Sequence, residues 1–379
     1  MAKPARTWST THGSSLPEEI LVWEILVRLP HKDLVRCRAV SHAWRRAASS
    51  RDLLVEHHRR QPSRPLINRR GSPGAEGRRW LHVAALDHEQ LQPVARLDSL
   101  HVCVKASCDG LLLLAEGVRG TPTGLSASIC NPATRQMGRL PQLKGYVAMG
   151  LYRHRPTGEY RLLLRWWFSR GSMYVLALDR HTQPLRRIQC PPDASHYRLS
   201  SSSSSTPVLL RGNLHWTLDT LALPRRTEIQ VFDTTAESFR RMSSPDVPIH
   251  GADLFEMDGV LGMYSWDNGM RAVRIWAMQD YESQVWSLKC SVELPMMPEM
   301  PLTQERRRSL MVVCEEGVVR VLVAFGGLLL CVDTEGKLLA SSRDDDHSLS
   351  ISKQFLKTSL VSHDFFSTFQ GDMNAWPFI

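Results

Sequence analysis

The side chains best suited to chemistry in this sequence are its cysteines and histidines, and none is spaced like a known catalytic or metal site. Cys103 and Cys108 have no second Cys or His pair at zinc-ligand spacing. The pair His57-His58 lies among arginines, without Cys or carboxylate at metal spacing. The G-x-S-x-G, Walker and H-E-x-x-H motifs are missing from the sequence. We therefore expect no catalytic residue, no metal ligand and no cofactor, and we interpret Cys103 and Cys108 as buried β-core side chains.

Two helical patterns occupy the first sixty residues. In residues 16–30, Leu16-Pro17 precede an acidic first turn and Pro30 ends the helix, with apolar residues between them at Ile20, Trp23, Leu26 and Leu29. A second pattern begins at Asp33, as its N-cap, and continues through Leu34, Cys37, Val40, Trp44 and Ala47. About forty residues bury little surface by themselves, so this module is expected to need a partner.

The order and spacing of these residues resemble an F-box over about residues 15–55. The resemblance is carried by Leu16-Pro17, Ile20, Glu24-Ile25-Leu26, Arg28-Leu29-Pro30, Leu34, Arg36, Val40-Ser41 and Trp44-Arg45. Glu24 stands one residue later after Leu-Pro than in the commonest form of the motif, which leaves the pitch of the first helix open. The resemblance implies binding to a Skp-type adaptor and, through it, to a cullin.

We expect adaptor binding to depend on one set of apolar residues, some by contact and some by holding the helices in register. The set is Leu16, Pro17, Ile20, Leu26, Leu29, Pro30, Leu34, Val40 and Trp44. The alternative is a free-standing helical cap in which these side chains are simply its own core.

The net charge of +9 is confined to the N-terminal part of the chain. Residues 1–80 contain 16 Lys and Arg against 7 Asp and Glu, and the remaining residues contain 31 of each. Few aromatic residues lie among these charges, so we favour a solvated basic linker or an acidic protein partner over a nucleic-acid groove. Residues 61–79, rich in Pro, Gly and Arg, are predicted to be the linker, and residues 1–14 a disordered tail.

A repeat of about fifty residues follows the linker. Turn glycines stand beside strand-like runs at Gly110, Gly158, Gly212 and Gly259. The residue 21 positions later is Asn131, Asp179, Asp233 or Asp280, and six positions further stands Met137, Leu185, Phe239 or Trp286. A degraded fifth copy occurs at Gly317, Asp333 and Leu339. The two hairpins in each repeat predict a β-propeller with blades of kelch-like length.

The predicted fold class is therefore α+β and multidomain, with a helical F-box at residues 15–60 and an all-β propeller at residues 80–379. The propeller is expected to have about six blades, with five as the alternative, and residues 81–100 and 342–379 are expected to close the ring together. The strings SCDGLLLL (107–114), GNLHW (212–216) and VFDTTAESFRRM (231–242) resemble the F-box-associated domain of plant-type F-box proteins. This resemblance implies a substrate-recognition domain without catalysis of its own.

The cellular location follows from the cysteines and from the apolar runs. Eight scattered cysteines, and a beginning without an apolar stretch typical of a signal peptide, lead us to expect reduced thiols in an intracellular protein of the nucleus or cytoplasm. The longest apolar run, Val321 to Val332, has 12 residues and is too short to span a bilayer, so no membrane is expected.

These patterns predict the substrate-recognition subunit of a Skp-cullin-F-box (SCF) ubiquitin ligase, with an unknown target protein and no enzymatic activity of its own. One alternative is a basic-armed nucleic-acid-binding scaffold, whose salt-dependent binding to polynucleotide would disappear on removal of residues 1–80. The other is a propeller enzyme, which would have a polar, titratable central funnel. The sequence assigns no residue to target binding.

Overall fold

The computed structural model describes most of the chain, and all structural statements below concern the described residues. They are residues 20–71, 81–87, 90–97, 102–116, 126–141, 143–166, 172–178, 185–190, 197–199, 206–220, 227–246, 252–266, 271–295 and 309–367. The chain divides into two compact units, one helical (Met1–Pro62 with Thr358–Ser362) and one of β-strands (Ser63–Lys357 with His363–Ile379).

The helical unit consists of short helices separated by residues that end or cap them. A π-helical turn, η1 (Leu21–Ile25), continues into a 3-10 turn, η2 (Leu26–Arg28), and is followed by α2 (His31–Cys37), α3 (His42–Ala47) and α4 (Arg51–Arg60). Ser41 and Ser50 are the N-caps of α3 and α4, because their hydroxyls accept from the amides of Trp44 and Leu53. Asp33 lies inside α2 instead of capping it, since the helix already begins after Pro30.

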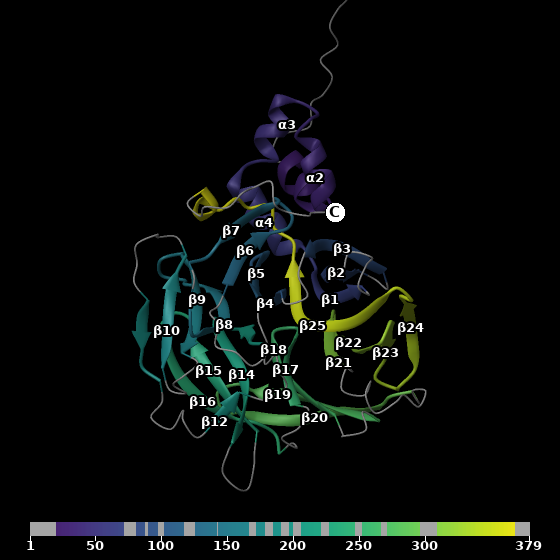
Figure 1. Cartoon of the computed structure of the whole chain (residues 1–379). Coiled ribbons are helices and arrows are strands. Elements are labelled where there is room, and N and C mark those ends of the chain that lie inside the picture. The colour runs from purple at the N-terminus through teal and green to yellow at the C-terminus, as the bar shows by residue number, and fades with distance from the viewer. Residues whose placement is uncertain are drawn as a thin grey trace, which may run out of the picture. The chain divides into compact units, whose positions relative to one another are not determined.

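The β-strand unit is a propeller of six antiparallel sheets, called blades I to VI here, which confirms the predicted fold class and the larger of the two blade numbers (Figure 1). Blade I contains β4 (Val102–Cys108), β5 (Leu111–Glu116), β6 (Ser126–Asn131) and β7 (Gln136–Arg139). Blade II contains β8 (Tyr146–Arg153), β9 (Tyr160–Trp166), β10 (Met173–Ala177) and β11 (Arg186–Ile188). In blade III, β12 (Tyr197–Leu199) and β13 (Val208–Leu210) both pair with β14 (Asn213–Thr220), and β15 (Thr227–Asp233) and β16 (Ser238–Ser243) follow.

The other three blades have four strands each. Blade IV contains β17 (Ala252–Met257), β18 (Val260–Trp266), β19 (Ala272–Asp280) and β20 (Val285–Glu293). Blade V contains β21 (Ser309–Glu315), β22 (Val318–Phe325), β23 (Leu328–Val332) and β24 (Leu338–Arg343). Blade VI joins β25 (His347–Lys357) to β1 (Ser63–Gly71), β2 (Leu81–Asp87) and β3 (Gln90–Leu97). The degraded fifth repeat of the sequence is thus a complete blade.

Blade VI closes the ring with strands from opposite ends of the propeller sequence. Ile67 in β1 stands opposite Ile351 in β25 on one side and Ala84 in β2 on the other. Figure 1 shows the yellow β25 beside β1. The structure differs here from the predicted linker at 61–79, because residues 63–71 form a strand between two others. The apolar pair Leu66 and Ile67, fully buried, provides the core contact that outweighs the Pro- and Arg-rich surroundings.

The turns that define the sequence repeat have the predicted geometry. Gly110, Gly158, Gly212, Gly259 and Gly317 all have positive φ. The carboxylates of Asp233 and Asp280 each accept two backbone N–H groups of the turn that follows, as Asn131 and Asp333 do with their side-chain oxygens. Asp179 lies outside the described residues. A feature absent from the prediction is a left-handed residue four positions after the Asx, at Arg135, Glu237 and Gln284.

Neighbouring blades are connected by side chains that reach from the turns or strands of one blade to the preceding blade. Glu237 of blade III, almost fully buried, accepts from Tyr152 Oη at 2.6 Å and from Arg161 Nη1 at 2.7 Å in blade II. Gln284 of blade IV accepts from the amide of Ser243 in blade III at 2.7 Å. The indole of Trp216 in blade III donates to the carbonyl of Met149 in blade II at 3.2 Å. Together with the apolar contacts between the sheets, these bonds help to fix the angle between neighbouring blades.

A buried histidine links blades III and IV. His215 has its Nδ1 3.2 Å from the carbonyl of Val208, so this nitrogen carries the proton and donates. Its Nε2 is therefore the acceptor for the hydroxyl of Tyr281, 2.8 Å away. Burial, with the nearby Arg240 guanidinium adding to it, lowers the pKa of His215 to about 4. The blade III–blade IV junction consequently requires a neutral imidazole.

We predict that Ile67→Ala destabilises the propeller by about 2 to 5 kcal/mol, as expected when a buried aliphatic side chain leaves a cavity between paired strands. Urea unfolding followed by circular dichroism measures the change. Leu338→Ala, at a half-exposed position of the outer strand β24, is the matched control and should change the unfolding free energy by less than about 0.5 kcal/mol. Equal stability of the Ile67→Ala variant and the original chain would show that residues 63–71 behave as a linker.

Acidification should weaken the propeller through His215. Its pKa is lower in the folded state than the ordinary value of 6.5, so the unfolded chain binds the proton first. The contribution is fully present above about pH 6.5 and is lost as the pH falls towards 4, by about 3 kcal/mol in total. Urea unfolding of the original chain and of His215→Asn at pH 7 and pH 4.5 measures this. The variant should show a smaller difference between the two pH values, and an equal difference would rule out His215 as the titrating group.

Candidate functional site

The helical unit exposes several large apolar side chains. Ile20, Trp23, Val35 and Val40 have exposed fractions of 44%, 41%, 42% and 63%. Elsewhere in these helices the surface is dominated by charged side chains such as Lys32, Arg36 and Arg45. Covering exposed apolar side chains with a partner lowers the free energy of the system. This surface of the helical unit is therefore the candidate protein-binding site.

The predicted adaptor-binding residues divide into exposed and buried groups. Ile20, Val40 and Pro30 are exposed, and Leu29 and Trp44 are half-buried. Leu26 and Leu34 are fully buried. Leu16 and Pro17 lie outside the described residues. The exposed group has the side chains that a partner could contact, whereas Leu26 and Leu34 can act only through the packing of the helices.

Hydrogen bonds to main-chain carbonyls hold the short helices together. Arg38, at the end of α2, donates through Nε and Nη2 to the carbonyl of Ala48 after α3, at 3.2 and 3.1 Å. Arg45 donates through Nε to the carbonyl of Arg38 at 3.0 Å. His57 on α4 is fully buried, with its Nε2 2.8 Å from the carbonyl of Leu29. These contacts set the position of Val40, which lies between α2 and α3.

Burial also determines the protonation of His57. Because desolvation opposes the charged form, the pKa of His57 lies below its ordinary value, although its contact with the Leu29 carbonyl acts in the opposite direction. The imidazole is therefore neutral near pH 7, and its Nε2–H donates a hydrogen bond to the carbonyl oxygen of Leu29. His57 therefore has a structural role, because it joins α4 to the residue that follows η2.

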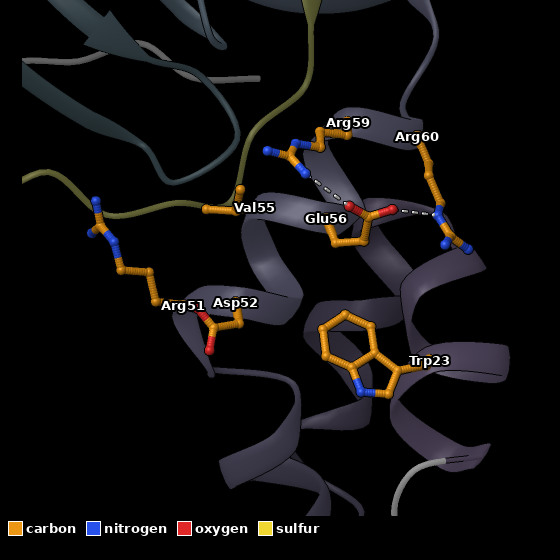
Figure 2. Close-up of a pocket in the computed structure, with 7 residues that line it drawn as sticks. All are labelled: Trp23, Arg51, Asp52, Val55, Glu56, Arg59 and Arg60. Atoms are coloured by element: carbon orange, nitrogen blue, oxygen red, sulfur yellow. Dashed lines mark hydrogen bonds and ion pairs between the residues drawn. The ribbon is translucent and has the colours of Figure 1, made fainter. Parts of the chain in front are cut away.

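A shallow pocket of about 420 Å³ lies on the helical unit between Trp23 and α4 (Figure 2). Its lining consists of Trp23, Arg51, Asp52, Val55, Glu56, Arg59 and Arg60. Figure 2 shows Glu56 between Arg59 and Arg60, with Nη1 of Arg59 at 3.5 Å and Nε of Arg60 at 3.0 Å from the carboxylate. The indole ring of Trp23 and the Val55 side chain provide its apolar part. The pocket thus combines an apolar part with charged side chains of both signs.

Two exposed residues, Trp23 and Val35, are absent from the predicted set. Trp23 belongs to the same predicted helical pattern as Leu26. In the structure Trp23 is exposed and Leu26 is buried, a difference that the pattern alone does not show. Val35 follows Leu34 directly, so a helix that buries Leu34 turns Val35 outward. Periodicity identifies the apolar face of each helix, but packing decides which part of that face remains available.

The described residues of the propeller form neither a metal-binding cluster nor a reactive thiol site. No three His, Cys, Asp or Glu side chains of the described part of the chain come close enough together to hold a metal ion. The eight cysteines are free thiols, of which Cys108 and Cys130 are buried and the others half-buried. Burial raises the pKa of both buried thiols, which disfavours the reactive thiolate. None of the described helices is long and apolar enough to cross a membrane.

Comparison with known proteins assigns both units. Residues 77–319 match the F-box associated beta propeller domain, and residues 14–60 match the F-box-like domain. The chain belongs to the F-box associated beta propeller family. It is similar to two proteins of Arabidopsis thaliana, F-box protein CPR1 (26% identity over 92% of this chain and 89% of that protein) and F-box protein At5g49610 (24% identity over 74% and 80%). Both resemblances found in the sequence are thereby confirmed.

We predict that Arg38→Lys destabilises the helical unit by about 1 kcal/mol, because an ammonium group on a flexible side chain cannot reproduce the two hydrogen bonds that Nε and Nη2 direct to the Ala48 carbonyl oxygen. Hydrogen exchange of the α2 and α3 amides measures the loss of protection. Arg36→Lys is the matched control, since Arg36 is exposed and pairs only with Asp33 one turn away. Equal protection in the two variants would contradict the role assigned to Arg38.

Proposed function

We propose that this chain is the substrate-recognition subunit of an SCF-type ubiquitin ligase. The helical unit binds a Skp-type adaptor, the adaptor connects it to a cullin, and the propeller binds a target protein. The observation that supports this most directly is the exposure of Ile20, Trp23, Val35 and Val40 on a unit that matches the F-box-like domain. As a ligase subunit, the chain would act inside the cell, in the nucleus or cytoplasm.

In this proposal the chain performs no bond-forming step. F-box proteins generally act as adaptor subunits, and the ubiquitin-transferring chemistry belongs to other members of the complex. The contribution of this chain is proximity: holding a target near the transfer site replaces a bimolecular encounter with an effectively intramolecular one. The propeller suits that task because its six connected blades form a rigid support for exposed turns.

The apolar residues of the helical unit have two roles in the proposal. Val40 and Ile20 contact the adaptor directly, together with Trp23 and Val35. Leu26 and Leu34 support these contacts by filling the core of the unit. The charges around the contact residues are partly neutralised within the unit, because Arg28 pairs with Glu24 at 2.6 Å and Arg36 with Asp33 at 2.8 Å. Apolar burial, more than net charge, would therefore provide the affinity.

The two roles give different experimental outcomes. Val40→Asp should weaken binding to a Skp-type adaptor by about 100-fold or more, without changing the unfolding free energy, because a carboxylate would be buried at the interface. Leu34→Ala should lower the stability of the helical unit by about 2 to 5 kcal/mol and weaken adaptor binding only as far as it unfolds the unit. Titration calorimetry with purified adaptor and hydrogen exchange measure the two quantities.

The matched control is Val318→Asp, which places the same charge at a half-exposed apolar position of the propeller. It should leave adaptor affinity unchanged. Full-affinity binding by the Val40→Asp variant would exclude Val40 as a contact. Failure of the intact chain to bind adaptor at all would remove the ligase proposal.

A further inference from the structure

The propeller carries an unusual group of arginines where blades II, III and IV meet. Arg155 lies in the β8–β9 turn, Arg211 in the β13–β14 turn and Arg240 on β16 just after the β15–β16 turn. All three are exposed. Tyr281, in the β19–β20 turn, lies beside two of them, with its ring centroid 4.9 Å from Cζ of Arg211 and 5.3 Å from Cζ of Arg240. We call these three arginines the Tyr281 arginine cluster.

The guanidinium groups of this cluster are held in place by neutral partners. Arg240 donates through Nη2 to the hydroxyl oxygen of Tyr281 at 2.8 Å, and that hydroxyl donates in turn to His215. The guanidinium of Arg155 rests on the turn glycine of the next blade, since a Cβ added to Gly212 would lie 3.2 Å from its Cζ. The cluster is therefore positioned before any ligand arrives, which reduces the entropy lost on binding.

No described carboxylate forms an ion pair with Arg155, Arg211 or Arg240. Glu237 is occupied by Arg161 and Arg186. Asp280 is exposed and near Arg211, but its Oδ1 accepts from the amides of Glu282 and Ser283 in its own turn. Glu282 adds a second exposed carboxylate at the margin. The three guanidinium groups keep N–H donors for an external acceptor, whereas Arg161 pairs with Glu159 and Glu237.

Among the described left-handed residues that precede a turn glycine, arginine occurs only in blade III. The first left-handed residue of the corresponding hairpin turn is Asp109 in blade I, Asp258 in blade IV and Glu316 in blade V, but Arg211 in blade III. Aspartate and asparagine tolerate this conformation better than a long side chain, so the turn gains no stability from arginine. The left-handed conformation is common to all four turns, so the turn itself does not require arginine at position 211.

We infer that the Tyr281 arginine cluster binds an acidic segment of the target protein, through carboxylate or phosphate groups. This inference depends on the proposed function, because it names the chemistry of the target that the propeller would present. Planar guanidinium groups bind either oxyanion with two parallel hydrogen bonds. The same segment would be attracted at long range, so binding should weaken steeply as the salt concentration rises.

The test uses the intact chain and labelled peptides of equal length: one rich in glutamate, one with phosphoserine at the same positions and one with serine. Fluorescence anisotropy should show saturable binding of the first two and not of the third. Comparing the affinities of the glutamate-rich and the phosphoserine peptides shows whether the Tyr281 arginine cluster prefers carboxylate or phosphate groups. A single-stranded oligonucleotide of similar charge is the fourth probe, and its preferential binding would overturn the inference in favour of a nucleic-acid site.

The decisive variant is Arg211→Asn, which removes the charge and places a residue suited to left-handed backbone in the turn. It should weaken binding of the acidic peptide about 10-fold while preserving or raising the unfolding free energy. Arg211→Asn/Arg240→Gln should weaken it further, and Arg139→Glu, an exposed arginine on β7, should have less than about a 2-fold effect.

Besides preferential binding of the oligonucleotide, two results would overturn the inference: acidic peptides that do not saturate the intact chain, or affinities that fall as much with Arg139→Glu as with Arg211→Asn. Adaptor binding by the same samples separates this outcome from failure of the ligase proposal. The Val40→Asp variant should lose adaptor and keep the acidic peptide, whereas the Arg211→Asn variant should do the reverse.

Discussion

The pairing of β1 with β25 is the constraint on which the propeller depends. Without it, blade VI would lack its inner strand and the ring would have two open edges, between blades V and I. The register places Ile67 opposite Ile351 and continues from Ser63 to Gly71 with one irregularity between Pro65 and Ile67. Hydrogen bonds such as those of Glu237 and Gln284 join blades II to IV to one another, and the β1–β25 pairing is the contact that joins the two ends of the propeller sequence.

Local features of the propeller could be predicted from its sequence, and distant pairings could not. The turn glycines and the Asx residues act through their own backbone within a few positions, so Gly212 and Asp233 identify their turns without reference to the rest of the chain. The strand character of residues 63–71 depends on partners at the other end of the propeller. A short apolar pair among prolines and arginines has no strand signal until β25 and β2 lie on either side of it.

The helical unit shows a second limit of the sequence. Leu26, Leu34, Ile20 and Val40 are equivalent by periodicity, yet the first two are buried and the last two exposed. The difference arises from the interruption of the helices at Leu29-Pro30 and at Ala39–Ser41, which redirects the apolar face of each short segment. The family resemblance implies a kind of partner, while the geometry separates exposed candidate contacts from core side chains. The Tyr281 arginine cluster had no sequence signal at all, because its three arginines are brought together only by the packing of adjacent blades.

The closure of blade VI also constrains how the chain is synthesised and folded. Strands β1 to β3 leave the ribosome early, but β25, which must cover one edge of β1, is made only after all the other blades. During that interval β1 presents an unpaired edge with buried-type side chains such as Ile67, the kind of surface that promotes mispairing and aggregation. The yield of folded protein in the cell should therefore depend on how well chaperones protect these early strands. A premature stop anywhere before β25 would remove the strand that closes the ring.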